Sequence, residues 1–261
     1  MAANGDQVVK KHFVLVHGAC HGAWCWFKLK PLLEAAGHRV SAFDLSASGT
    51  DTRVIQQVTS LSDYTLPLLE FMAAVPAEEK VVLVGHSLGG MNIALAMEKF
   101  PEKVAAGVFL TAFMPDFVHK ASYVLDKYNE RTPAEAWLDT QFLPYDNKLG
   151  TTMFFGPEFL SKKLYQLCSV EDRELGNILI RPGSLFLKDL NNGLQFTKEG
   201  YGSVRRVFIV CDDDKAIDKE FQQWMIDNNP VVEKKELKNV DHMAMLCDPK
   251  QLSFCLLDIA R

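Results

Sequence analysis

The chain has 261 residues, of which 48% are hydrophobic and 23% charged, and its formal net charge is −5 at pH 7. These values are ordinary for a globular protein and argue against intrinsic disorder and against a basic surface for nucleic acid. The longest apolar runs are strand-sized, far short of the ~20 residues that span a bilayer. The first residues are polar and do not resemble a secretory signal. We therefore expect a cytoplasmic protein that binds neither nucleic acid nor membrane.

Six cysteines are scattered through the chain, mostly among apolar neighbours. Their spacing does not match a zinc site, and disulfides are unexpected in a cytoplasmic protein. We expect buried free thiols and no bound metal.

Strand-like runs alternate with helical patterns along the chain. Strands are expected at residues 12–16, 38–43, 80–84, 104–110, 207–210 and 232–237, and helices at 26–36, 63–74, 87–100, 219–228 and 249–260. Such alternation predicts a mostly parallel sheet with helices on both faces, because parallel strands need crossover connections. The predicted fold class is α/β.

The rhythm changes between residues 115 and 200, where aromatic residues and short amphipathic stretches replace the strand-like runs. Insertions into α/β proteins commonly enter loops at the carboxyl edge of the sheet, where ligands also bind. We therefore predict a core of residues 1–114 and 201–261 that carries an inserted, mainly helical cap of residues 115–200.

The most informative motif is Gly85-His86-Ser87-Leu88-Gly89, a Gly-x-Ser-x-Gly pattern. It follows a buried strand-like run and precedes a helix-prone stretch. A serine on so sharp a turn presents its hydroxyl group with little bulk around it, beside the positive end of the next helix. The motif predicts that Ser87 is a nucleophile.

A serine nucleophile needs a histidine to accept its proton and a carboxylate to orient that histidine. Of the seven histidines, His242 is the one in a late loop after the last predicted strand. Three adjacent aspartates, Asp212, Asp213 and Asp214, follow the strand before it, as the order serine, acid, histidine requires. Spacing alone does not choose among them.

The loop after the first strand reads His17-Gly18-Ala19-Cys20. Acyl transfer needs backbone N–H groups directed at the developing oxyanion, and this kind of fold takes them from an early loop and from the residue after the nucleophile. These requirements nominate the amides of Ala19 and Leu88.

The chain resembles, over almost its whole length, the plant methylesterase and hydroxynitrile lyase family of α/β-hydrolases. The likeness rests on residues 12–24, 28–33 and 44–49 and on Asp241-His242-Met243. It implies the α/β-hydrolase fold, and alignment of the segment around Lys215 selects Asp214 as the acid. The implied catalytic triad is Ser87, Asp214 and His242.

The lyases of this family carry a threonine at the position of Gly18, a lysine at that of Met243 and an acidic residue at that of His86. A threonine can bind a cyanohydrin hydroxyl group while crowding the oxyanion region, and a lysine can stabilise departing cyanide. The present chain offers none of these groups, so we expect an esterase. A hydroxynitrile lyase, or a receptor that binds small acids in the same pocket, is the alternative.

The resemblance also implies an apolar acyl pocket under the cap. Its substrate-binding residues are Gly18, His86, Trp137, Phe142, Phe155, Leu185 and Met243. We expect a serine carboxylesterase that needs no cofactor and hydrolyses a small methyl ester of a hydrophobic acid, such as methyl salicylate, methyl jasmonate, methyl indole-3-acetate or an alkaloid ester. The sequence leaves a homodimer open.

Overall fold

The computed structural model describes residues 10–145, 150–229 and 232–261. Its centre is a six-stranded sheet in the order β2-β1-β3-β4-β7-β8, in which every neighbouring pair is parallel. The strands are β1 (His12–Val16), β2 (Arg39–Ala42), β3 (Val81–His86), β4 (Val104–Leu110), β7 (Arg206–Cys211) and β8 (Glu233–Leu237). The predicted parallel sheet is confirmed, and the predicted bounds of each strand agree to within two residues.

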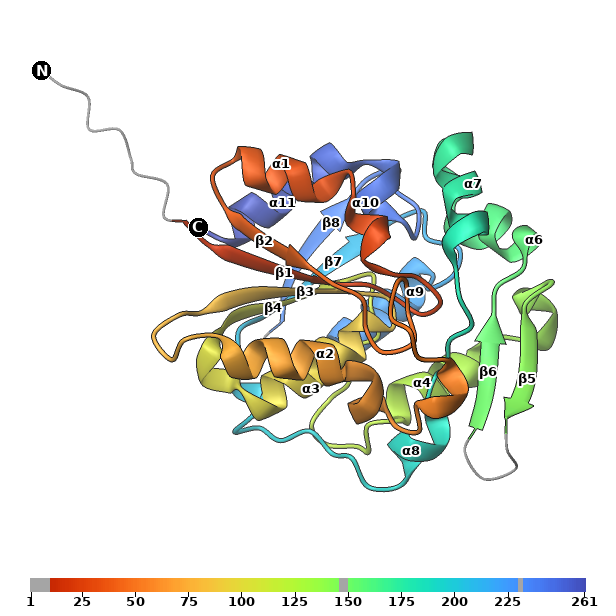
Figure 1. The fold of residues 1–261 in the computed structure, drawn as a ribbon, viewed down its shortest axis with the longest axis horizontal. Helices are drawn as coiled ribbons and strands as arrows, with labels where there is room; N and C mark the ends of the chain where they lie inside the picture. The colour runs from red at the N-terminus through yellow and green to blue at the C-terminus, as the bar shows by residue number, and fades with distance from the viewer. Residues whose placement is uncertain (1–9, 146–149, 230–231) are drawn as a thin grey trace, which may run out of the picture.

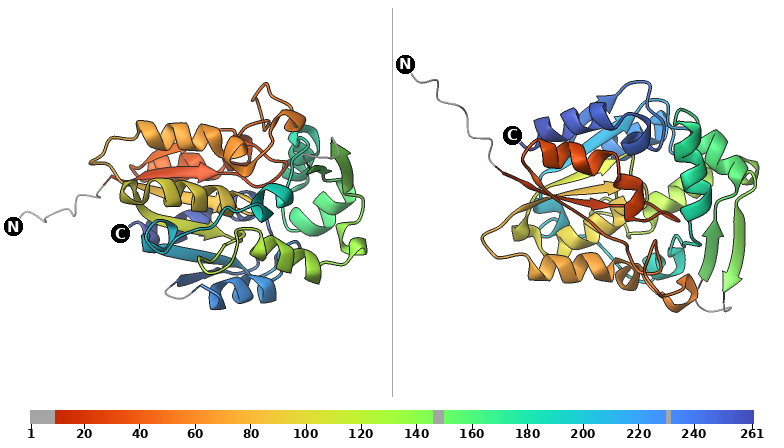
Figure 2. Two further views of the ribbon diagram at one scale, coloured as in Figure 1. Left: turned by 90° about the horizontal axis from the view of Figure 1, so that it is seen from below. Right: turned by 45° about the horizontal axis from the view of Figure 1, so that its top comes forward.

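Helices cover both faces of this sheet (Figures 1 and 2). Helices α1 (Leu29–Ala35) and α11 (Pro249–Ile259) pack together on one face, and α2 (Leu61–Ala74) and α3 (Gly89–Lys99) on the other. Helix α9 (Lys219–Asp227) packs against β7, and the short α10 (Ala244–Cys247) precedes α11. The chain's local signals explain several helix starts: Ser60, Asp218 and Asp248 each accept a hydrogen bond from the first turn of the helix that follows.

The predicted cap contains short helices and one β-hairpin. Its helical elements are α4 (Tyr123–Arg131), η4 (Ala134–Trp137), α6 (Pro157–Phe159), η5 (Leu160–Leu164), α7 (Val170–Leu179) and α8 (Leu187–Asn191). Strands β5 (Gln141–Tyr145) and β6 (Gly150–Phe154) pair antiparallel in a sheet of their own. The sequence analysis did not anticipate this hairpin. Figure 1 shows the hairpin, α6 and α7 together at one end of the central sheet, away from the two termini.

Hydrogen bonds and one ion pair fasten the cap to the core. The Arg181 guanidinium donates to the carbonyl oxygens of Gly49, Asp51 and Arg53, at 2.5 to 2.9 Å. The Lys28 ammonium lies 2.5 Å from the buried Asp172 carboxylate. These contacts join loops of the core to both ends of α7.

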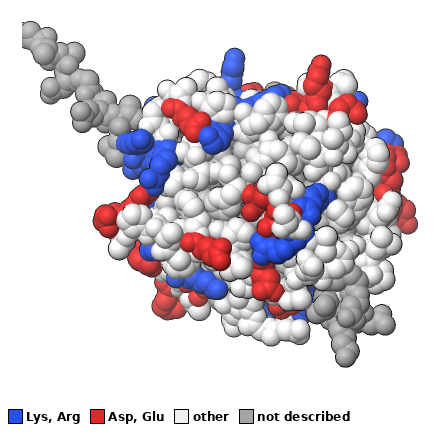
Figure 3. Space-filling model, in the orientation of Figure 1, with Lys and Arg blue, Asp and Glu red and all other residues white. Residues whose placement is uncertain are grey.

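None of the described helices is long and apolar enough to cross a membrane. The six cysteines are free thiols, and among residues 10–145, 150–229 and 232–261 no cluster of histidine, cysteine and carboxylate side chains is arranged to hold a metal ion. On the face seen in Figure 3, basic and acidic side chains are interspersed.

Candidate active site

Ser87 stands on the sharp turn between β3 and α3. Its φ angle is 54°, in the left-handed region that residues other than glycine rarely adopt. Glycines on both sides permit the turn, because a Cβ at Gly85 would lie 2.5 Å from the carbonyl oxygen of Gly89, and one at Gly89 would lie 2.6 Å from that of Val16. The turn places Ser87 in the lining of a cavity and beside the first turn of α3.

The side chains of Asp214 and His242 are buried and hydrogen-bonded to each other, with 2.6 Å between Oδ2 and Nδ1. The same carboxylate oxygen accepts a hydrogen bond from the Thr111 hydroxyl group. The other oxygen accepts from the amides of Ala216, at 2.7 Å, and Ile217, at 2.9 Å. These donors hold the carboxylate in one orientation. Its bond to Nδ1 leaves Nε2 of His242 as the ring's acceptor.

The two neighbouring aspartates lie differently. Asp212 and Asp213 face surface lysines, at 3.7 and 3.8 Å, whereas Asp214 turns inward after β7. The sequence alone left the choice among the three open, and the contact with His242 belongs to Asp214.

His86 is buried against His242. Its Nε2 donates a hydrogen bond of 2.8 Å to the carbonyl oxygen of His242, and the two rings lie 4.6 Å apart. Burial, reinforced by the neighbouring His242 and His21, lowers the pKa of His86 well below its ordinary value, so this ring is neutral at neutral pH. In the part of the chain that the structure describes, Nδ1 of His86 has no hydrogen-bond partner. The neutral His86 ring thus fixes the backbone of His242 through one tautomer.

Gly18 lies against the Ser87 turn. A Cβ at Gly18 would lie 2.8 Å from the Cβ of Ser87 and 3.1 Å from Nδ1 of His86. A larger residue would therefore displace one of these side chains. Ala19 and Leu88 both line the cavity beside Ser87, and their amides remain our predicted oxyanion hole.

The cavity over Ser87 has a volume of about 30 Å³ and also contains His242 in its lining. We call it the catalytic cavity. Most of its walls are apolar, and the cap supplies a large part of them. The cap residues that line it include Tyr128, Trp137, Met153, Phe155, Phe159 and Leu185.

Comparison with known proteins agrees with this arrangement. A family model described as the alpha/beta hydrolase family matches residues 13–252. The chain belongs to the alpha/beta hydrolase family. A Ser-His-Asp triad is typical of this family.

The hydrolase is 64% identical to salicylic acid-binding protein 2 of Nicotiana tabacum over an aligned stretch of 252 residues. This stretch covers 96% of this chain and 97% of the relative. It is 59% identical to methylesterase 1 of Arabidopsis thaliana over 98% of each chain. It also resembles the crystal structure of polyneuridine aldehyde esterase, with a TM-score of 0.95 and 50% identity over 97% of this chain and 100% of the other.

The predicted substrate-binding residues of this hydrolase lie in different places. Trp137, Phe155 and Leu185 line the catalytic cavity. Phe142 is 42% exposed and lines a neighbouring cavity. Met243 is fully buried at the start of α10, directly after His242.

Sequence reasoning missed other residues of the site. Met153 and Phe159 reach the cavity because the hairpin and α6 fold back over Ser87, and no local pattern announces this. Thr111 carries a weak signal, since it directly follows β4 and the carboxyl ends of neighbouring parallel strands meet at one edge of the sheet.

His21 links the loop after β1 to the cap of this hydrolase. Its Nδ1 donates to the carbonyl oxygen of Ala19, at 2.9 Å, and its Nε2 lies 2.7 Å from the hydroxyl group of Tyr165. The ring stacks with those of Trp24 and Tyr165. Burial lowers the pKa of His21 to about 3, so the ring stays neutral and serves as a structural hydrogen-bonding group.

Proposed function

We propose that the protein is a serine carboxylesterase that hydrolyses small methyl esters of hydrophobic acids. The observation that carries the proposal is the Asp214–His242 hydrogen bond beside Ser87, with Ser87 and His242 in the lining of one apolar cavity. The names of the relatives support it, because one is a methylesterase, one an aldehyde esterase and one a salicylic acid-binding protein.

In the proposed reaction the Ser87 hydroxyl oxygen attacks the ester carbonyl carbon, and its proton passes to Nε2 of His242. The amides of Ala19 and Leu88 hold the negative oxygen of the tetrahedral intermediate. Asp214 stabilises the imidazolium that forms. His242 then gives its proton to the departing methanol, which leaves the acyl group on Ser87.

Water completes the cycle. His242 removes a proton from a water molecule, whose oxygen attacks the acyl carbon, and the proton returns to Ser87 as the acid leaves. The apolar walls supplied by Trp137, Phe155 and Leu185 favour a hydrophobic acyl group. Methyl salicylate, methyl jasmonate, methyl indole-3-acetate and alkaloid esters remain our candidate substrates.

The two alternatives have less support. A lyase site would need a hydroxyl group near Ser87 and a cation after His242, whereas Gly18 has no side chain and Met243 is apolar. A pure receptor for a small acid has no use for a carboxylate held by several donors against a histidine. Product binding in the same pocket is compatible with the esterase.

The test is hydrolysis of a panel of methyl esters by the full chain, with kcat/KM measured for each and compared with Ser87→Ala. We expect the wild type to release methanol from at least one methyl ester of a hydrophobic acid. Ser87→Ala should lower kcat by several orders of magnitude. Retained turnover in Ser87→Ala, or cyanide release from mandelonitrile at a rate comparable with ester hydrolysis, would overturn the assignment.

A cytoplasmic location, a role in plant hormone or specialised metabolism, and a homodimer are further proposals. The plant relatives named for salicylic acid and for methylesterase activity support the metabolic role. Fractionation of plant cells and size-exclusion chromatography with light scattering test the location and the oligomeric state.

A further inference from the structure

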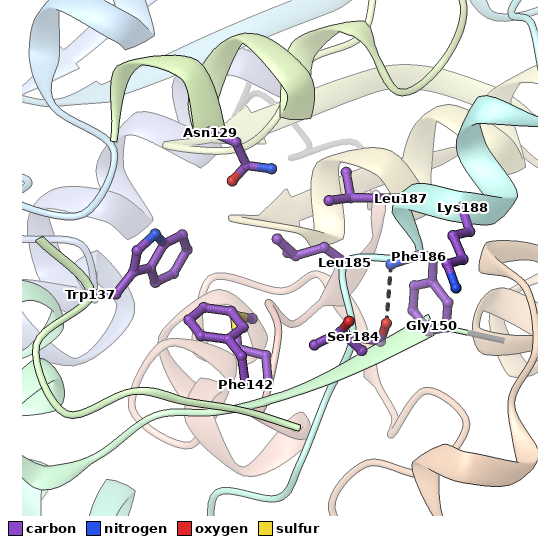
Figure 4. A pocket seen from close by; sticks show the side chains of 11 residues that line it. Asn129, Trp137, Phe142, Gly150, Ser184, Leu185, Phe186, Leu187 and Lys188 are labelled. Carbon is purple, nitrogen blue, oxygen red and sulfur yellow. Dashed lines mark hydrogen bonds between the residues drawn. The ribbon is translucent and has the colours of Figure 1, made fainter. Parts of the chain in front are cut away.

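A second cavity lies under the cap beside the catalytic cavity, and we call it the outer chamber. Its volume is about 250 Å³, against about 30 Å³ for the catalytic cavity. Trp137, Met153 and Leu185 line both spaces, so these side chains form the partition between them. Figure 4 shows the outer chamber between α4, the hairpin and the segment that leads into α8.

The catalytic cavity is too small to take a whole substrate by itself. Its volume suffices for a few water molecules, whereas ligand pockets commonly measure ~300–1,000 Å³. The two spaces together approach this range. A substrate whose ester group reaches Ser87 would therefore extend past Trp137 and Leu185 into the outer chamber.

The walls of the outer chamber are mostly apolar. On the hairpin, Phe142 pairs with Met153, and Thr151 lies two residues before Met153, so all three side chains are on one face of the two strands. These three residues line the chamber. Leu185, in the segment that leads into α8, and Leu187, the first residue of α8, line it as well.

Ser184 and Lys188 also line the chamber, and the Ser184 hydroxyl oxygen accepts a hydrogen bond from the Phe186 amide. The remaining, larger part of the walls is apolar and favours a hydrocarbon skeleton.

Asn129 adds a polar group to these walls. It lies near the end of α4 and is partly buried. Figure 4 shows its carboxamide directed into the chamber, across from Leu185. A carboxamide both donates and accepts hydrogen bonds, and a hydrogen bond in partly desolvated surroundings discriminates between a ligand with a polar atom at that point and one without.

We propose that the outer chamber is a subsite for the distal part of the acyl group, and that Asn129 hydrogen-bonds a keto or hydroxyl oxygen on it. The preferred substrates are then methyl esters of acids with an apolar skeleton and one oxygen function far from the ester. This inference rests on the proposed ester hydrolysis by Ser87. It assigns the acyl chain a direction, from Ser87 past Trp137 toward Asn129.

Two matched series of substrates test the proposal with the full chain. One is the methyl oxoalkanoates with a terminal methyl ketone, and the other is the methyl alkanoates of the same chain lengths, with methyl acetate as the shortest ester. We expect kcat/KM for the oxo ester to exceed that of its alkanoate partner roughly tenfold at one or two chain lengths, the worth of one good hydrogen bond. Equal values at every length would overturn the proposal.

Asn129→Leu keeps the size of the side chain and removes its hydrogen-bonding groups. We expect the preference for the oxo esters to fall to about one, mainly through a higher KM, while hydrolysis of methyl acetate stays within about twofold. A preference that survives in Asn129→Leu would show that Asn129 does not bind the distal oxygen.

Thr151→Trp fills the outer chamber from the hairpin. We expect kcat/KM for the longer esters of both series to fall about tenfold or more, with methyl acetate unchanged within about twofold. The matched control is Leu143→Trp, which adds a similar ring on the other face of the same hairpin, where Leu143 is 59% exposed. It should leave all esters unchanged. If Thr151→Trp does not fold, Phe142→Ala enlarges the same chamber and should shift the optimum to longer esters.

The outcomes separate this inference from the proposed function. If the wild type hydrolyses no ester of either series and no methyl ester of the panel described under the proposed function, the proposed function fails. If it hydrolyses an ester of that panel but none of either series, the inference about the outer chamber fails and the proposed function stands. If the wild type hydrolyses the esters of the two series, the effect of Thr151→Trp decides. Should Thr151→Trp lower kcat/KM for methyl acetate as much as for the long esters, or lower neither value, the outer chamber is not the acyl subsite.

Discussion

The core and the cap hold their functional residues in different ways. In the core, Ser87 sits on a turn that the glycines around it permit, and Asp214 is held by two backbone amides and a hydroxyl group. The cap contributes apolar side chains from a two-stranded hairpin and from short helices. The proposed catalytic side chains are thus held in fixed positions by the core. The apolar side chains proposed to contact the substrate lie on the hairpin and short helices of the cap, where substitutions can alter the cavity walls without moving the catalytic side chains. We therefore expect core substitutions to change kcat and cap substitutions to change the choice of substrate.

The largest effect should come from Asp214→Asn. The amide would leave His242 without its anionic partner and favour the wrong tautomer, so kcat should fall about 10⁴-fold, as such changes do in other triads. Asp213→Asn is the matched control, because Asp213 lies next to it in the chain but faces a surface lysine. It should stay within about twofold of the wild type. Comparable losses in the two variants would contradict the assignment of the acid.

A smaller effect in the core should follow from Gly18→Ala. The new Cβ would lie 2.8 Å from that of Ser87, so we expect kcat/KM for every ester to fall about tenfold or more while the midpoint of thermal unfolding changes little. Steady-state kinetics with three unrelated methyl esters is the measurement. The combination of Gly18→Thr and Met243→Lys should lower esterase activity further and raise cyanide release from mandelonitrile. A decrease in kcat/KM for only one of the three esters would mean that Gly18 acts in substrate selection. It would contradict the expectation that core substitutions affect all esters alike.

In the cap, Phe155→Leu should act on selectivity. Phe155 lines the catalytic cavity and stacks on Phe159 with ring centroids 4.9 Å apart, so we expect kcat/KM for methyl salicylate to fall roughly 5- to 30-fold, with methyl acetate nearly unchanged. Phe154→Leu, one residue earlier, does not alter a lining residue of either cavity and serves as the control. If Phe155→Leu lowered both esters equally, the cap would contribute to the chemical step itself.

Much of the core could be predicted because its signals are local. Parallel strands buried on both faces read as short runs of valine and leucine, and the turn residues around Ser87 predict a nucleophile there without any knowledge of the tertiary structure. Chain order pointed to His242. The choice of Asp214 needed a family resemblance, because adjacent aspartates look alike until the turn after β7 directs one of them inward.

The cap was less predictable, since its arrangement depends on long-range packing. The β5–β6 hairpin was not predicted, although two of the predicted substrate-binding residues belong to this region: Phe142 lies in β5, and Phe155 directly follows β6. Periodicity does not tell which face of such a hairpin covers a cavity. Phe142 was expected in an acyl pocket under the cap, and it lines the outer chamber rather than the catalytic cavity. Met153 was missed for the same reason.

The smallest predicted effect concerns stability and pH. The pKa of His21 is about 3 in the folded protein but near 6.5 when unfolded, so the unfolded state takes up more protons as the pH falls below 6.5. His21 therefore contributes stability at neutral pH that is lost progressively between pH 6.5 and about 3. Burial lowers the pKa of His17 and His86 too, which act in the same direction.

Urea unfolding at pH 7.5 and pH 5.5 measures this loss. In His21→Gln the decrease in unfolding free energy between the two pH values should be smaller than in the wild type by roughly 1 kcal/mol. An unchanged decrease would mean that His21 takes up a proton as readily in the folded protein as in the unfolded chain, and a ring that stays neutral down to a pH of about 3 would be wrong.

The most direct test of the central claim is covalent labelling of the folded protein with a fluorophosphonate, read by intact-mass and peptide mass spectrometry. The wild type should gain one phosphonyl group, located on the peptide that contains Ser87, and Asp214→Asn should react far more slowly. Ser87→Ala should gain none. A folded wild type that stays unlabelled, or that is labelled on another serine, would contradict the account.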